Sequence, residues 1–319
     1  MSGNDSGFPK QVGLALGSGA ARGWAHLGVI RALAEAGIEI NFVAGTSIGS
    51  LVGAAFALGK TNELEDFARG LDWKQIVSFL DVTFPRSGLI DGKKITDFFR
   101  GQIRNINIEE MSLAYCAVAT DLSTGQENVL SSGNLIDAVR ASISIPGIFT
   151  PVKKDGDFLV DGGLVNPVPV SVVRNMGADF VIAVDVNADR LRGRRTRKDD
   201  SADPAAGNRA DPSRAAKWGL ARELANRFGD LSSPALSQVR QWMNKDPAPS
   251  IFEVLTTSIS IMESRITAVR LVADPPDLLL QPQLGYIRSL EFHRAEEAIA
   301  EGYREAVARL ADANPGKRY

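Results

Sequence analysis

Short apolar runs alternate with helical patterns along the first part of the chain. Residues 12–16 form an apolar run, and the apolar positions 27, 30, 33 and 34 that follow have the spacing of a helix with one buried face. A second apolar run, at 38–44, leads into another helical pattern at 50–57. Uninterrupted apolar runs of this length are typical of the buried strands of parallel sheets. The alternation therefore predicts an α/β fold.

The same alternation continues through most of the remaining chain. A helix that reaches Leu71 is expected to begin with a capping box made by Asn62 and Glu65. Residues 85–88 indicate a turn. Further strands are expected at 113–119, 128–130, 181–186 and 277–280, and further helices at 136–143, 251–271 and 292–310.

The composition changes between residues 187 and 250. Residues 190–198 include six Arg or Lys, and residues 199–212 are polar and contain Ala, Pro and Gly, which predicts a mobile segment. This stretch is too short and too polar to build a core of its own. We therefore expect one domain at 12–310 that contains a basic, partly mobile insertion at about 187–250, with polar tails at 1–11 and 311–319.

The overall composition excludes several classes of protein. The chain has 319 residues, of which 44% are apolar and 23% charged, as in ordinary globular proteins, and its net charge of −2 gives no case for nucleic-acid binding. Its single cysteine, Cys116, excludes an internal disulfide and a cysteine-rich metal site. No stretch approaches the ~20 apolar residues of a membrane span, and no signal-peptide pattern is present. We expect a cytoplasmic protein.

The sequence Gly45-x-Ser47-x-Gly49 stands where the apolar run 38–44 meets the next helical pattern. This strand–turn–helix context is what a nucleophile elbow requires. Glycines on both sides allow a sharp turn that holds Ser47 in a strained conformation, with its hydroxyl above the sheet. The alternative is an ordinary turn in which Ser47 only caps the following helix.

A glycine-rich loop, residues 17–23, joins the first apolar run to the first helical pattern. A dinucleotide site fits poorly, because the third glycine is Gly23 rather than residue 22 and no acid ends the second run. The other interpretation is an oxyanion hole, in which backbone N–H groups of Gly17, Ser18 and Gly19 face a developing negative charge. Arg22 could support this loop, attract an anionic head group, or lie on the surface.

The apolar run 158–160 ends in Asp161-Gly162-Gly163. Asp161 is either a turn residue bonded to its own loop or a base held at the tip of a strand. A Ser–His–Asp triad would need a histidine after the acid, and the chain has only His26 and His293. We expect both histidines to be structural, because neither lies on a strand-end loop. A carboxylate is a weak base, so it would have to be buried and close to the serine.

Taken in order, the glycine loop, the elbow and the Asp-Gly-Gly turn resemble the patatin-like phospholipases. The likeness is strongest to the bacterial RssA-type branch, which shares the patatin domain of neuropathy target esterase. Residues 140–147, 165–169 and 292–295 extend the match. The resemblance covers residues 12–188 and 250–305 and leaves the insertion out.

The resemblance implies a three-layer α/β/α fold with a mostly parallel sheet and a Ser–Asp dyad that hydrolyses lipid esters through an acyl-enzyme. It implies no metal and no cofactor. The implied roles are Ser47 as nucleophile, Asp161 as base, Gly17, Ser18 and Gly19 as oxyanion hole, Arg22 and Gly23 as loop support, Gly45 and Gly49 as elbow, and Gly162 and Gly163 as base turn. A thioesterase, a soluble-ester carboxylesterase, a nucleotide-binding module and a regulatory protein with a vestigial site remain alternatives.

The basic run 190–198 also predicts contact with anionic membrane surfaces. The pattern that follows it carries Trp218, Phe228 and Trp242, which suit a lipid–water interface. The alternative is a solvated linker followed by a helix packed on the protein.

Overall fold

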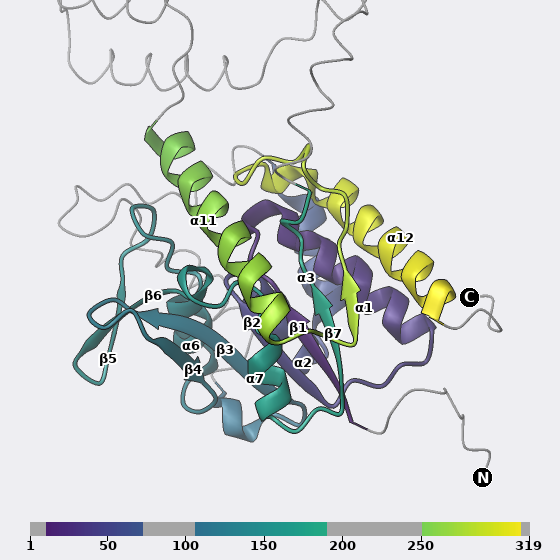
Figure 1. The fold of residues 1–319 in the computed structure, drawn as a ribbon, viewed down its shortest axis with the longest axis horizontal. Helices are drawn as coiled ribbons and strands as arrows, with labels where there is room; N and C mark the ends of the chain where they lie inside the picture. Colours follow the sequence, from purple (N-terminus) through teal and green to yellow (C-terminus); the bar gives the residue numbers. More distant parts are fainter. Residues whose placement is uncertain (1–10, 73–105, 190–250, 314–319) are drawn as a thin grey trace, which may run out of the picture. The chain divides into compact units, whose positions relative to one another are not determined.

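The computed structural model describes residues 11–72, 106–189 and 251–313 (Figure 1). Within these ranges an eight-stranded sheet has the order β5-β6-β3-β2-β1-β7-β8, with β4 also paired to β3. Strands β3, β2, β1, β7 and β8 are parallel, whereas β4 and β6 run antiparallel to β3, and β5 to β6. The strands are β1 Val12–Leu16, β2 Phe42–Thr46, β3 Ala114–Asp121, β4 Glu127–Leu130, β5 Val152–Lys154, β6 Asp157–Asp161, β7 Phe180–Val184 and β8 Leu278–Leu280.

Helices cover both faces of this sheet (Figure 1). They are α1 Ala25–Glu35, α2 Ile48–Ala57, α3 Thr61–Gly70, α6 Leu135–Ser142, α7 Val170–Asn175, α11 Ile251–Ala273 and α12 Ala295–Ala313, with short 3-10 helices η1 Ala20–Trp24, η2 Ile108–Glu110, η3 Gly162–Leu164 and η4 Phe292–Arg294. Successive residues of β1 point to opposite faces, so Leu14 and Leu16 pack in one core with α1, α2 and α12, and Ala15 packs in a second core with α7. The predicted three-layer α/β/α fold is confirmed.

Two local predictions are wrong. The second strand begins at Phe42 rather than Ile38, because the helix before it ends in a left-handed Gly37 and the Ile38 N–H bonds back to the Leu33 carbonyl. Ile38 therefore belongs to the helix cap. The capping box at the start of α3 is also absent, because Lys60 is the N-cap residue and no side chain caps it.

The expected turn at 85–88 and the insertion, apart from its first residues to 189, fall outside the described residues. The expectation of one domain with a mobile insertion and two tails therefore stays a prediction. Residues 292–294 form η4 rather than the first turn of the closing α-helix, which starts at Ala295. In the described ranges, no helix is long and apolar enough to cross a lipid bilayer.

Candidate active site

Ser47 lies in a strained turn between β2 and α2. Its φ of 56° and ψ of −127° are rare for a residue with a side chain. A Cβ atom on Gly45 would lie 2.2 Å from the Gly49 carbonyl oxygen, and one on Gly49 would lie 2.2 Å from the Leu16 carbonyl oxygen. Strand and helix thus meet too closely for a side chain at Gly45 or at Gly49, as a nucleophile elbow requires.

Hydrogen bonds hold this serine by its backbone and leave its hydroxyl for one partner. The Ser47 N–H donates to Ser142 Oγ (2.9 Å), and Ser142 Oγ donates to the Val118 carbonyl (2.5 Å). The Ser47 side chain makes no capping bond to α2, so the helix-cap interpretation is wrong. Its Oγ instead donates to Asp161 Oδ2 at 2.5 Å.

Asp161 ends β6 and is only 4% exposed. Its Oδ1 accepts a hydrogen bond from the Gly163 N–H (2.7 Å), and its backbone bonds to the Ser144 carbonyl (3.0 Å) and to Thr120 Oγ1 (2.8 Å). Asp161 is therefore both a turn residue bonded to its own loop and an acid at a strand tip that faces the serine. One oxygen is bonded to its own turn, and the other faces the serine hydroxyl.

The surroundings of Asp161 change its acidity. Burial raises the pKa of Asp161 to about 7, the negative charge of Glu263 acts in the same direction, and the hydrogen bonds from Ser47 and Gly163 oppose both. A general base works best when its pKa is near the working pH. An aspartate with an ordinary pKa near 4 would be a far weaker base.

The glycine loop does not offer all three predicted backbone donors. The Gly17 N–H donates to the Val184 carbonyl (3.0 Å) and the Ser18 N–H donates to the Pro167 carbonyl (2.8 Å). These two bonds tie the loop to the end of β7 and to the segment after η3. Of the three predicted donors, only the Gly19 N–H has no protein acceptor among the described residues.

The next residue supplies a second N–H of this kind. In the described part of the chain, the Ala20 N–H also donates to no protein group, and Ala20 has a positive φ of 50°. The loop lies against the elbow, because a Cβ atom on Gly23 would be 2.1 Å from Ile48 Cγ2 in the first turn of α2. The available donors are therefore those of Gly19 and Ala20 rather than Gly17 and Ser18.

Two buried side chains support this loop from behind. Arg22 is 1% exposed, so it is not a surface arginine, and it donates to Asn187 Oδ1 (2.7 and 3.1 Å) and to the Ile287 carbonyl (3.0 Å). His26 Nε2 lies 2.8 Å from the Gly17 carbonyl oxygen. Burial lowers the pKa of His26 to about 4, so its ring is neutral at pH 7 and Nε2–H donates to that oxygen. His293 is exposed on η4.

The sequence predictions missed three side chains at this site. Ser142 lies within the family match at 140–147, but that match alone does not show that its hydroxyl binds the backbone of Ser47. Glu263 is one of two glutamates on a 23-residue helix, and it belongs to no recognisable sequence motif. Asn187 lies at the edge of the expected insertion, where the pattern gives no reason to select it.

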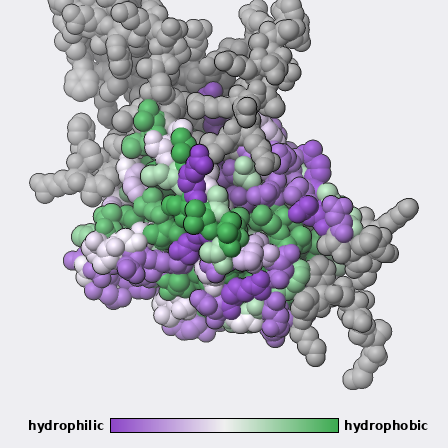
Figure 2. Space-filling model, in the orientation of Figure 1, coloured by the Kyte–Doolittle hydropathy of each residue, from purple (hydrophilic) through white to green (hydrophobic). Residues whose placement is uncertain are grey.

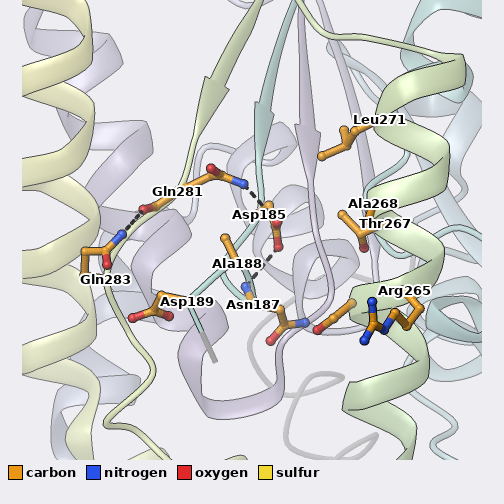
Figure 3. A pocket seen from close by; sticks show the side chains of 11 residues that line it. Asp185, Asn187, Ala188, Asp189, Arg265, Thr267, Ala268, Leu271, Gln281 and Gln283 are labelled. Atoms are coloured by element: carbon orange, nitrogen blue, oxygen red, sulfur yellow. Dashed lines mark hydrogen bonds between the residues drawn. The ribbon is translucent and has the colours of Figure 1, made fainter. Parts of the chain in front are cut away.

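A cavity of about 240 Å³ lies at the carboxyl ends of β7 and β8 (Figure 3). It is lined by Asp185, Asn187 and Gln281 on the sheet side and by Thr267 and Leu271 of α11 on the other. Asn187 borders both this cavity and the glycine loop, because its Nδ2 donates to the Ser18 carbonyl (3.0 Å). Helix α11 therefore passes over the carboxyl ends of the parallel strands.

The chain matches a family model over about its first half and a relative over most of its length. Residues 14–174 match the family model described as patatin-like phospholipase. An uncharacterized NTE family protein of Mycobacterium bovis is 35% identical over 333 residues, which cover 92% of this chain and 89% of that protein.

Two further relatives are much longer than this chain. Lysophospholipase NTE1 of Pyricularia oryzae is 30% identical, over 95% of this chain and 19% of that protein. Patatin-like phospholipase domain-containing protein 7 of Mus musculus is 36% identical, over 56% of this chain and 14% of that protein.

Proposed function

The chain belongs to the patatin-like phospholipase family and is a lipid acyl hydrolase, and we propose that Ser47 is its nucleophile and Asp161 its general base. The observation that carries this proposal is the 2.5 Å hydrogen bond from Ser47 Oγ to Asp161 Oδ2 at a strained elbow. The family match does not favour a nucleotide-binding module.

In the first half-reaction, Ser47 Oγ attacks the carbonyl carbon of the lipid ester and its proton passes to Asp161 Oδ2. The carbonyl oxygen becomes negatively charged and accepts hydrogen bonds from the N–H groups of Gly19 and Ala20. When the tetrahedral intermediate collapses, the alcohol leaves and takes the proton from Asp161. The acyl group stays on Ser47 as an ester.

In the second half-reaction, water attacks the acyl-enzyme. Asp161 accepts a proton from that water, and the same two N–H groups stabilise the second oxyanion. Collapse breaks the bond to Ser47 Oγ, which takes the proton back from Asp161, and the fatty acid leaves. A base with a pKa of about 7 can accept and return a proton at neutral pH.

We propose that the ester belongs to a phospholipid or a lysophospholipid. The test is a panel of phospholipids, lysophospholipids, acyl thioesters and short soluble esters, with the Ser47→Ala protein as the blank. We expect fatty-acid release from the phospholipids or lysophospholipids by wild type only. Release from thioesters or soluble esters alone would contradict the substrate proposal and leave the dyad in place.

We also propose that the protein contacts anionic membranes. The six basic residues at 190–198 support this proposal, since each charge near an anionic surface contributes about 1 kcal/mol. Helix α11 adds exposed apolar side chains, namely Ile261, Met262, Val269 and Val272, and Figure 2 shows apolar residues on the face that carries this helix.

The test is co-sedimentation with vesicles of anionic or of neutral lipid. Deleting residues 190–212 is expected to abolish the preference for anionic vesicles. Exchanging Val269 and Val272 for Asp is expected to weaken binding to both kinds of vesicle. Unchanged binding by the deletion variant would contradict the electrostatic part of this proposal.

A further inference from the structure

A second carboxylate lies beside the base turn. Glu263, on α11, is 7% exposed. A Cβ atom on Gly163 would lie 2.2 Å from Glu263 Oε1 and 3.1 Å from Asp161 Oδ1. The two carboxylates therefore lie close together on the same side of one glycine. Gly163 has no side chain to separate them.

Glu263 is also connected to the glycine loop through Asn187. Its Oε2 lies 3.5 Å from Asn187 Nδ2. The same Asn187 side chain binds the Ser18 carbonyl through Nδ2 and the Arg22 guanidinium through Oδ1. One buried glutamate thus lies between the turn that carries the base and the loop that carries the free N–H groups.

In the described ranges, no cationic side chain is among the groups that shift the pKa of Asp161. On α6, the Arg140 guanidinium is held by Ser144 Oγ and the Thr150 carbonyl. On β5, Lys153 and Lys154 are exposed to solvent. In the same ranges, Glu263 is the charged side chain that raises the pKa of Asp161. Its effect is smaller than that of burial.

We propose that Glu263 is a positioning residue of the hydrolase site, which strengthens Asp161 as a base by holding a negative charge beside it and ties the base turn to the oxyanion loop. This proposal rests on the proposed Ser47–Asp161 dyad. The physical reason is that two adjacent carboxylates resist being ionised together, so a proton binds one of them more tightly. Burial alone would leave Asp161 with a lower proton affinity.

The change that tests this is Glu263→Gln, which keeps the shape and removes the charge. The readout is the rate at which a fluorophosphonate labels Ser47, measured from about pH 5 to about pH 9. This rate needs a working base but no lipid. We expect the acid limb of the profile to move to lower pH by at least about one unit, because the neighbouring charge no longer opposes ionisation of Asp161. We expect the rate at high pH to fall several-fold, because a weaker base activates the serine less.

Asp189→Asn is the matched control. Asp189 is also a buried acid near Asn187, at 8% exposure, but its Oδ2 accepts from the Gly285 N–H (2.8 Å) and its charge is not among those acting on Asp161. Its acid limb should coincide with that of wild type. A purely structural role for Glu263 would lower the labelling rate at every pH and leave the limb where it is, and that result would overturn the proposal.

A second variant changes Gly163, the other partner in the contact with Glu263. Gly163→Ala places a methyl group against Glu263 Oε1 and should displace the carboxylate, so its acid limb should move in the same direction as that of Glu263→Gln. An unmoved limb in the folded Gly163→Ala protein would overturn the proposal even if Glu263→Gln does not fold. If the fluorophosphonate does not label the wild-type protein, the proposed dyad is overturned, and the role of Glu263 with it. Labelling with the shifted limb but no lipid hydrolysis would overturn only the lipid substrate.

Discussion

Two buried aspartates lie at the ends of strands in this sheet. Asp161 ends β6 and Asp185 follows β7, with exposures of 4% and 5%. Burial raises the pKa of both. Their partners differ, because Asp161 faces a serine hydroxyl, whereas Asp185 accepts from the Asn187 N–H (3.0 Å) and from Gln281 Nε2 (3.3 Å) (Figure 3).

The difference comes from the residues that follow each aspartate. Asp161 is followed by Gly162, where a Cβ atom would lie 2.3 Å from the Val118 carbonyl oxygen, and by a second glycine that leaves room for Glu263. Asp185 is followed by residues that carry side chains, and a Cβ atom on Gly19 would lie 2.2 Å from Val186 Cγ2. Burial alone does not make a base. The group that the carboxylate faces decides its role.

The largest expected effect is on activity at the first aspartate. Ser47→Ala removes the attacking oxygen, and Asp161→Asn keeps the shape of the side chain but cannot accept the serine proton. Each should lower kcat by about 10⁴-fold or more, and the double variant should be hardly worse than either, because the two residues act as a unit. Steady-state hydrolysis by folded protein, checked by circular dichroism, measures this.

The histidines are the controls for that experiment. His26→Ala and His293→Ala should retain activity per folded molecule, apart from the loop support that His26 gives to Gly17. A folded but inactive histidine variant, or a fully active Asp161→Asn protein, would contradict the dyad.

The next largest effect is on stability. Asp161 has a pKa of about 7 in the folded protein, whereas an unfolded aspartate has one near 3.8. Between these two values the folded state binds more protons, so the free energy of unfolding falls as pH rises. The difference between these two pKa values corresponds to a loss of stability on the order of 4 kcal/mol, which is complete above about pH 7.

Asp161→Asn should remove this loss and be more stable than wild type at pH 8 while being inactive. Urea unfolding at about pH 4 and about pH 8 measures the difference between the two proteins. Equal pH dependence in wild type and variant would show that Asp161 titrates normally in the fold.

A smaller effect is expected at the glycine loop, which we propose supplies the oxyanion hole. Gly19→Ala should lower kcat by about 10²-fold, on the order of 3 kcal/mol, because its Cβ atom would lie 2.2 Å from Val186 Cγ2 and the loop must move away from the donor position. Val186→Ala removes that methyl group, so the double variant should regain activity. If the double variant is no more active than Gly19→Ala while both are folded, the position of the loop N–H groups does not explain the loss of activity.

The sequence predicted the parts of the site that a local motif requires. Gly45, Gly49 and Gly162 each stand where a side chain would collide with backbone, and such glycines can be recognised from spacing alone. Long-range contacts could not be predicted in this way. Nothing local shows that the Gly17 N–H is used by the end of β7, or that Glu263 reaches Gly163 from a helix 100 residues later.

The smallest effect is expected at the second aspartate, and it tests the comparison most directly. Asp185→Asn keeps an oxygen that can accept from Asn187, and it removes a buried charge that no reaction step uses. We expect kcat within about fivefold of wild type and a higher free energy of unfolding at pH 8, since burial raises the pKa of Asp185 as well.

Asp185 also attracts the Arg22 guanidinium, which opposes that rise in pKa. Burial is the larger effect on this pKa, so losing the attraction to Arg22 should leave the activity within the range given above. A loss of activity as large as that of Asp161→Asn would be a different result. It would mean that both strand-end carboxylates serve the reaction, and that the turn after the strand does not separate a base from a structural acid.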